Sequence, residues 1–234
     1  RGAHRTAQEP HSIRRDRSLT PPARLPTLET ERLRLRWLEE RDVEALYQVF
    51  ADPAVMRYWS SPPLADLAAA KALLQEIHDY FARGNLYQWG VARADTDRVI
   101  GTVTLAHIDR THRRAGVGFA LAKPVWGQGY ATEAVARLIE HAFDDLELHR
   151  LEADVDPRNE PSLRLLEQLG FLREGLLRER YHLAGEIQDS VIMGLLRREW
   201  VARRRHASED LAPRGNTSQE RELRSRPRDG RGLG

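Results

Sequence analysis

The chain has 234 residues, 41% of them hydrophobic and 31% charged, so it can bury a sizeable core without disulfides or metals. Its 37 Lys and Arg residues nearly balance 35 Asp and Glu residues, and a net charge of +2 does not indicate nucleic-acid binding. The absence of cysteine excludes disulfides, thiolate zinc sites and a Cys nucleophile. No apolar run approaches the roughly 18 residues of a membrane span, and none resembles a signal-peptide core, so we expect a soluble, cytoplasmic protein without membrane or specific nucleic-acid partners.

The two ends of the chain differ in composition from its middle. Residues 1–26 are rich in Arg, Pro, Ser and Thr without hydrophobic periodicity, which predicts a disordered, Arg-rich arm. Residues 202–234 are similar and predict a disordered polar tail, which leaves one folded domain over residues 27–201. Weak contact of these ends with an acidic partner such as RNA stays open, but solvated tails are the favoured interpretation.

The first third of the expected domain predicts one strand and two helices. Alternating leucines and charged residues predict a half-buried strand over 28–36. Apolar residues at helical spacing predict helices over 42–50 and 64–83, and Gly84 is a typical C-terminal signal for the second helix.

The middle of the chain predicts a run of strands followed by a helix. The strands are expected over 87–92, 99–106 and 116–122, and the short polar links between them favour an antiparallel meander. The pronounced amphipathic pattern that follows predicts a helix over 130–146.

The last third predicts a strand over 151–155, a helix over 161–169 that ends at Gly170, and a hairpin whose strands lie within 171–181 and 187–196. The complete order β, α, α, β, β, β, α, β, α, β, β is that of an α/β domain with a mixed sheet.

The stretch Val117 to Thr132, VGFALAKPVWGQGYAT, joins a strand to a helix through a glycine-rich turn. Unpaired N–H groups and the positive end of the helix dipole meet at such a junction, which suits a phosphate. An ordinary connection without a ligand is one alternative. A Rossmann dinucleotide site is another, but Thr132 stands at the third glycine position and the preceding strands predict a meander. A P-loop is excluded because no Gly-Lys-Ser or Gly-Lys-Thr follows.

Several motifs in order along the chain resemble the GNAT superfamily of acyl-CoA-dependent N-acetyltransferases, and most nearly its branch with the ribosomal-protein-alanine N-acetyltransferases. The motifs are LETERL (28–33), DPAV (52–55), IG (100–101), WGQGYATEA (126–134), NEPS (159–162), LGF (169–171) and REG (173–175). The resemblance covers residues 28–200. It implies the GNAT fold, a mixed and mostly antiparallel sheet flanked by about four helices, with two strands that splay apart at the cofactor site.

The resemblance implies acetyl-CoA as the cosubstrate. The main-chain N–H groups that would bind its pyrophosphate are those of Trp126, Gly127, Gln128, Gly129, Tyr130, Ala131 and Thr132. Trp126 stands where the general family pattern has Gln or Arg. The strand segment implied to pair with the pantetheine arm is Phe119, Ala120 and Leu121. Asn159 is implied beside the thioester, although asparagine is also a common helix cap.

The implied reaction is direct attack of a primary amine, from a protein N-terminus or a small polyamine or amino-sugar, on the thioester. Ser162 resembles the general acid of this branch, and a role at the helix N-terminus is the alternative. The base stays open. Asp154 matches a catalytic glutamate of a neighbouring branch, and Glu152 lies on the same strand face, but Asp154 without a catalytic role is also compatible with the pattern.

Two positions depart from related branches, because Leu166 stands where some have a tyrosine acid and Tyr181 where another has an acidic residue. These departures leave open a non-catalytic acyl-CoA-binding sensor or scaffold. Tyr58 and Trp59, between the first two expected helices, are expected to contact the amine acceptor. The histidines show no HxH or HExxH spacing, so we expect no metal. A homodimer through sheet or hairpin edges is compatible with the pattern.

Overall fold

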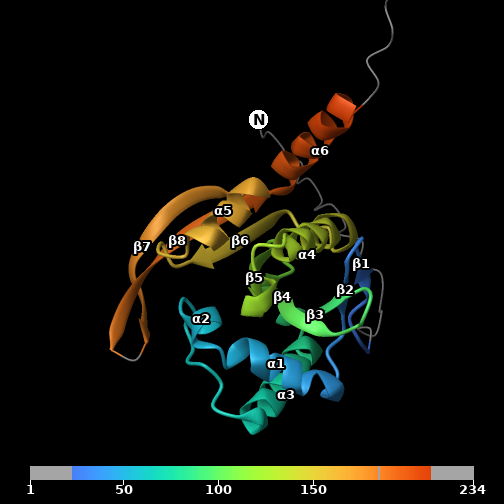
Figure 1. The fold of residues 1–234 in the computed structure, drawn as a ribbon. Coiled ribbons are helices and arrows are strands. Elements are labelled where there is room, and N and C mark those ends of the chain that lie inside the picture. The colour runs from blue at the N-terminus through green and yellow to red at the C-terminus, as the bar shows by residue number, and fades with distance from the viewer. Residues whose placement is uncertain (1–22, 184, 212–234) are drawn as a thin grey trace, which may run out of the picture.

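The computed structural model describes residues 23–183 and 185–211, with side chains described as far as His206. Within these ranges, eight strands form one sheet in the order β1-β2-β3-β4-β5-β6-β8-β7 (Figure 1). The strands are β1 (Leu28–Glu29), β2 (Leu33–Arg36), β3 (Leu86–Arg93), β4 (Val99–Asp109), β5 (Arg114–Leu121), β6 (Arg150–Val155), β7 (Leu172–Leu183) and β8 (Glu186–Leu196).

The helices alternate with these strands in the second half of the chain and precede β3 in the first. They are α1 (Val43–Phe50), α2 (Pro53–Met56), α3 (Leu67–Ala82), α4 (Tyr130–Glu140), α5 (Glu160–Gln168) and α6 (Arg197–Leu211), with short turns of other helical types at η1 (Glu40–Asp42), η2 (Lys123–Val125) and η3 (His141–Asp145). In the part of the chain that is described, no helix has both the length and the apolar character needed to cross a membrane.

The sheet is mixed, as predicted. Strands β1 to β5 pair antiparallel with their sequence neighbours, β5 pairs parallel with β6, and the β7–β8 hairpin joins the far edge of β6 antiparallel. The antiparallel meander is therefore confirmed, and it excludes the consecutive parallel βαβ units on which a Rossmann site depends.

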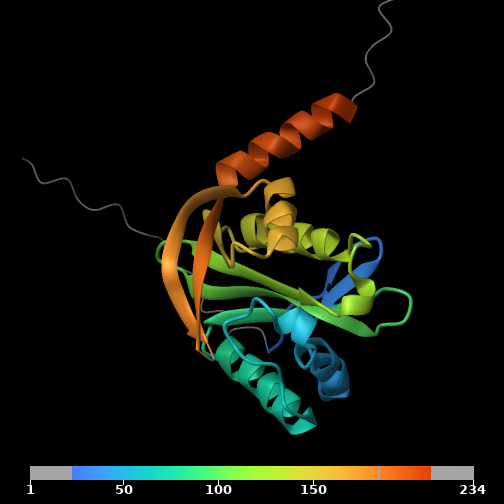
Figure 2. The same ribbon diagram turned by 60° about the vertical axis from the view of Figure 1, so that its left-hand side comes forward.

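Helices cover both faces of the sheet. Figure 2 shows α1 and α3 on one face and α4 and α5 on the other. Leu46 and Leu74 belong to the core on the first face, whereas Leu138 and Leu166 belong to the larger core on the second. Burying each such side chain contributes about 1.5–3 kcal/mol, so the apolar stripes of these helices hold the layers together.

Three segments near the expected boundaries differ from the prediction. The strand over 28–36 is divided because Thr30 accepts a hydrogen bond from the Leu33 N–H (2.9 Å) and turns the chain between β1 and β2. Asp52 ends α1 and also starts α2, since its carboxylate accepts the Ala54 N–H at 2.8 Å. The helix that begins at Tyr130 leaves α geometry at His141 and continues as a single π-helical segment.

The helix α6 crosses residue 201, where the folded domain was expected to end. Trp200 packs into the main core with only 8% of its surface exposed, which anchors the start of this helix. Most of the expected N-terminal arm (1–22) and the chain beyond residue 211 lie outside the described residues.

Candidate active site

The strands β5 and β6 separate after a short paired segment. They pair only at Arg114↔Arg150, Ala115↔Leu151 and Gly116↔Glu152. Beyond these pairs the next residues of both strands, 117–119 and 153–155, line a cavity of about 210 Å³. The structure thus has the pair of splayed strands that the resemblance implied, and the gap between them is the candidate site.

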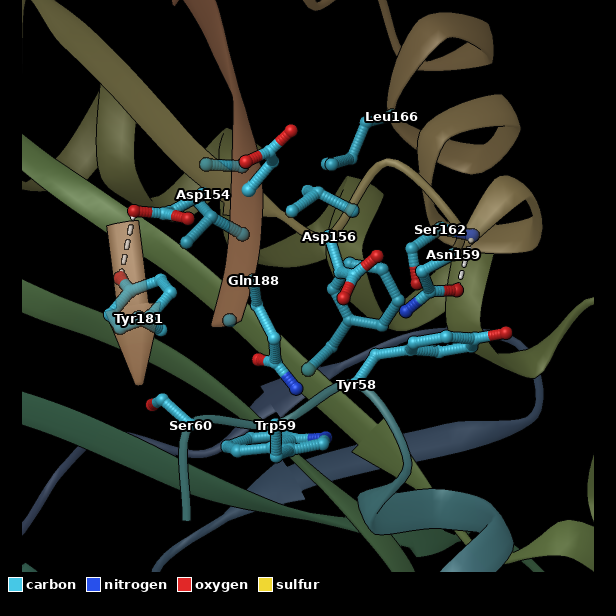
Figure 3. Close-up of a pocket in the computed structure, with 16 residues that line it drawn as sticks. Tyr58, Trp59, Ser60, Asp154, Asp156, Asn159, Ser162, Leu166, Tyr181 and Gln188 are labelled. Carbon is cyan, nitrogen blue, oxygen red and sulfur yellow. Dashed lines mark hydrogen bonds between the residues drawn. The ribbon is translucent and has the colours of Figure 1, made fainter. Parts of the chain in front are cut away.

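The other sides of this cavity come from three separate parts of the chain (Figure 3). The loop after α2 contributes Tyr58 to Ser60. Helix α5 and the residue before it contribute Asn159, Ser162 and Leu166, and the β7–β8 hairpin contributes Tyr181, Gln188 and Asp189. The two predicted acceptor residues, Tyr58 and Trp59, therefore lie at the same cavity as Ser162 and Asp154, two of the three predicted catalytic residues.

The edge of β5 that faces the gap offers main-chain groups to a ligand. Ala122 donates its N–H to Ile100 of the β4 side (2.9 Å), and alternation along an antiparallel strand directs Ala120 the same way. The main-chain N–H and C=O groups of Phe119 and Leu121 accordingly face the gap. Of the three predicted pantetheine contacts, Phe119 lines the cavity, whereas the side chains of Ala120 and Leu121 are 5% exposed and belong to the core.

The glycine-rich turn carries a run of main-chain N–H groups without a partner. Among the described residues, the N–H groups from Gly127 to Thr132 donate to no protein acceptor. Gly127 and Gly129 have φ of +73° and +80°, a conformation that glycine adopts without strain. Such a nest at the start of an 11-residue helix fits a diphosphate, because the donors and the helix dipole act together.

Trp126 is the exception among the predicted pyrophosphate donors. Its N–H is already bonded to Lys123 O at 3.2 Å inside η2, so this residue does not supply a main-chain donor. Its indole N–H donates to Leu121 O at 2.7 Å, which holds a half-exposed ring beside the turn.

Asn159 and Ser162 combine a structural role with a position at the cavity. Asn159 Oδ1 caps α5 by accepting the Ser162 N–H at 3.3 Å, as the cap interpretation expected. Because the oxygen is used in this way, the amide nitrogen is directed to the opposite side, toward the cavity (Figure 3). Ser162 also lines the cavity, so capping and site roles coexist here.

Asp154 lies at the centre of a hydroxyl–carboxylate cluster on the opposite side of the cavity (Figure 3). Its carboxylate accepts hydrogen bonds from the Tyr181 hydroxyl (2.8 Å) and from the Ser190 hydroxyl, and Arg180 Nε lies 3.7 Å away. Burial, together with the hydrogen bond to Asp154 and its negative charge, raises the pKa of the Tyr181 phenol. This phenol therefore stays protonated at neutral pH.

Glu152 is not brought into the cavity. It shares a strand face with Asp154, as alternation predicted, but it pairs with Gly116 before the strands separate. Its carboxylate accepts from Arg150 Nε at 2.7 Å and from Arg114 Nη1 at 3.3 Å. Glu152 thus belongs to an ion-pair cluster beside the paired segment of β5 and β6, because only residues beyond the last paired position face the gap.

The lining of the cavity is acidic. It includes Asp154, Asp156 and Asp189, and no Lys, Arg or His side chain among the described residues lines it. Asp156 is 7% exposed and is paired with Arg158 at 2.7 Å, whereas Asp189 accepts the Glu179 N–H at 2.8 Å. Asp154, whose ion-pair partner Arg180 lies 3.7 Å away, and Asp189 leave a surface that favours a cationic ligand.

Sequence reasoning did not assign a site role to several residues that line the cavity, namely Ser60, Asp156, Tyr181, Gln188 and Asp189. Tyr181 supplies a phenol from β7, although the helix position at which related branches have a tyrosine is occupied by the fully buried Leu166. Counting outward from the hairpin turn pairs Tyr181 with Gln188, as in the structure, and this count could have predicted that the two residues lie side by side. Within the described ranges, no group of three or more His, Cys, Asp or Glu side chains is arranged to hold a metal ion.

Comparison with known proteins agrees with this geometry. A family model described as an acetyltransferase (GNAT) domain matches residues 32–172. The chain is 40% identical to "Uncharacterized N-acetyltransferase p20" of Bacillus licheniformis over 76% of this chain and 99% of that protein. It is 30% identical to "Putative ribosomal N-acetyltransferase YdaF" of Bacillus subtilis (strain 168), over 73% of this chain and 94% of that protein.

A solved structure with the same architecture is that of spermidine N-acetyltransferase from Vibrio cholerae in complex with CoA and spermine. It is similar with a TM-score of 0.66 and 26% sequence identity, over 74% of this chain and 99% of the other. The predicted resemblance and the predicted fold are both confirmed by these matches.

Proposed function

This chain belongs to the GNAT acetyltransferase family, and from that premise we propose that it transfers acetyl from acetyl-CoA to the primary amine of a small cationic acceptor. The observation that carries the proposal is the acidic cavity at the splay of β5 and β6, in which Asp154 lies opposite Ser162. A polyamine or an amino-sugar matches this lining in charge and size. A protein N-terminus is the second acceptor class to test.

The cosubstrate is assigned to the cleft side of β5 and to the start of α4. The N–H groups from Gly127 to Thr132 would hold the pyrophosphate, and the main chain at Phe119 and Leu121 would pair with the pantetheine arm. When bound, acetyl-CoA supplies an activated acetyl thioester. The half-exposed ring of Trp126 borders the same turn.

The residues of the cavity supply the proton transfers. An ammonium acceptor loses two protons from its nitrogen: one leaves to give the neutral amine, and the second is released as the C–N bond forms and the C–S bond breaks. The departing sulfur takes up one proton, and the other is passed to solvent. Asp154 would attract the ammonium form of the acceptor and take its proton, directly or through water. Of the hydroxyl groups at the cavity, those of Ser162 and Tyr181 are the proposed proton donors. Tyr58 and Trp59 would contact the carbon skeleton of the acceptor.

The proposal is tested in two steps. Calorimetric titration with acetyl-CoA is expected to show binding at submillimolar concentration, and its absence would refute the cofactor assignment. Release of free CoA thiol is then measured with spermidine, spermine, glucosamine and peptides beginning with Ala or Ser. We expect turnover with a small amine. Binding of acetyl-CoA without turnover of any acceptor would instead favour a sensor or scaffold.

The acid role of Ser162 is tested by Ser162→Ala. If Ser162 delivers the proton to sulfur, kcat is expected to fall about 10²-fold while the Kd of acetyl-CoA measured by calorimetry stays unchanged. Ser60→Ala, which removes another hydroxyl of the same cavity, is the matched control and is expected to alter KM more than kcat. An unchanged kcat in Ser162→Ala would leave Tyr181 as the donor.

A further inference from the structure

The motif LETERL at 28–33, which carries no role so far, meets the end of the WGQGYATEA motif (126–134) beside the glycine-rich turn. Arg32 and Glu133 are 101 residues apart in sequence, yet Arg32 Nε donates to Glu133 Oε2 at 2.7 Å and Arg32 Nη2 lies 2.6 Å from the same oxygen. The Thr30 hydroxyl and the Arg32 N–H donate to the other carboxylate oxygen at 2.6 and 2.9 Å. The β1–β2 turn is thus tied to the first turns of α4.

The same guanidinium also reaches the glycine-rich turn itself. Arg32 Nη1 donates to Gln128 O at 3.0 Å, and the guanidinium lies 4.5 Å above the Tyr130 ring. A Cβ added at Gly129 would lie 3.3 Å from Arg32 Nη2. The guanidinium is therefore in contact with Gln128 and Tyr130, the two residues that flank Gly129.

Holding the Gln128 carbonyl has a direct consequence for the next N–H group. In a trans peptide the C=O and the following N–H point in opposite directions. When Arg32 holds the Gln128 oxygen on its own side, the Gly129 N–H is directed to the other side, where it donates to no described residue. The contact thus orients a donor of the anion nest and does not occupy it.

The charges of Arg32 and Glu133 cancel each other locally. Glu133 lies in the first turns of α4, where an ionised carboxylate would repel a bound phosphate. Although burial by itself raises the pKa of Glu133, the hydrogen bonds from Thr30 and Arg32 outweigh this effect and hold the pKa below its usual value. Glu133 stays ionised, and Arg32 neutralises it. Arg32 consequently fixes the geometry of the turn, and the ion pair adds little net charge there.

We propose that Arg32, fixed by Glu133, is a positioning residue that presets the Gln128–Gly129 peptide for the CoA pyrophosphate. This inference rests on the proposed function. It predicts that a lysine at position 32, which keeps the charge but lacks the planar fork that serves a carboxylate and a carbonyl together, cannot replace the arginine.

The experiment compares Arg32→Lys and Arg32→Gln with the wild-type full chain by calorimetry. The ligands are CoA and pantetheine, which lacks the pyrophosphate. Both variants are expected to bind CoA about tenfold more weakly, as loss of one charge-assisted hydrogen bond implies, with unchanged affinity for pantetheine. Arg34→Lys is the matched control, because Arg34 lies two residues further on, in β2, and its ion pairs among the described residues are long, with Glu29 (3.8 Å) and Asp97 (3.9 Å). It is expected to bind CoA like wild type.

Thermal unfolding of each variant separates positioning from simple tethering of β1–β2. Wild-type CoA affinity in a folded Arg32→Lys protein would overturn the inference. So would an equal loss for both ligands, which a structural role explains, or a loss in Arg32→Gln alone, which a charge effect explains. Failure of wild type to bind CoA would overturn the proposed function together with this inference, whereas the three preceding outcomes overturn the inference alone.

Discussion

Asp154→Asn is expected to lower kcat by about 10²–10³-fold, the usual contribution of a general base, and to leave the Kd of acetyl-CoA unchanged. The amide keeps the shape of the carboxylate but only one acceptor oxygen, so it can accept from the hydroxyl of either Tyr181 or Ser190 but not from both. It cannot take a proton from the acceptor or attract its positive charge. Thiol release measures kcat, and calorimetry measures cofactor affinity.

Asp189→Asn is the matched control for this prediction. Asp189 lines the same cavity, but its Oδ1 already accepts the Glu179 N–H. We expect its kcat to stay within a few-fold of wild type. Tyr181→Phe, which removes only the hydroxyl, is expected to have an intermediate effect, because Asp154 loses one of its two donors. A kcat of Asp154→Asn equal to that of the Asp189 control would show that Asp154 has no catalytic role.

Gly129→Val is expected to weaken CoA binding by at least 10²-fold. The residue has φ of +80°, where a side chain costs roughly 1–2 kcal/mol and a β-branched one is disfavoured most. The new Cβ would also lie 3.3 Å from Arg32 Nη2. Relief of the backbone strain or of this close approach would turn the Gly129 N–H away from its present direction. Calorimetry with CoA gives the loss, and thermal unfolding shows whether the variant is folded.

The control for this variant is Gly175→Val, at a position in β7 where an added Cβ meets nothing within 4 Å and where φ is not positive. It is expected to bind CoA normally. Normal CoA affinity in a folded Gly129→Val protein would contradict the assignment of the turn to the pyrophosphate and would leave an ordinary strand-to-helix connection.

Much of the fold could be predicted from local patterns. The stripe of α4, the alternation in β2 and the glycine turn depend on residues close in sequence, so periodicity and turn chemistry were sufficient for them. The helix α2 was not predicted, because its local signal is weaker. The helix α2 begins at the same Asp52-Pro53 pair that ends α1, and the pair alone does not show that a second helix follows.

The candidate site divides in the same way. Sequence by itself determined the family motifs, the glycine-rich turn and the presence of Asp154 and Ser162, because each is encoded in a short stretch. Only the tertiary structure decided which side chains meet. Glu152 is excluded because β5 and β6 part just after its position, and Tyr181 reaches Asp154 across 27 residues through the β7–β8 hairpin. Arg32 reaches the turn across about a hundred residues. Such contacts depend on strand register and on the packing of helices against the sheet, which residues distant in the chain set together.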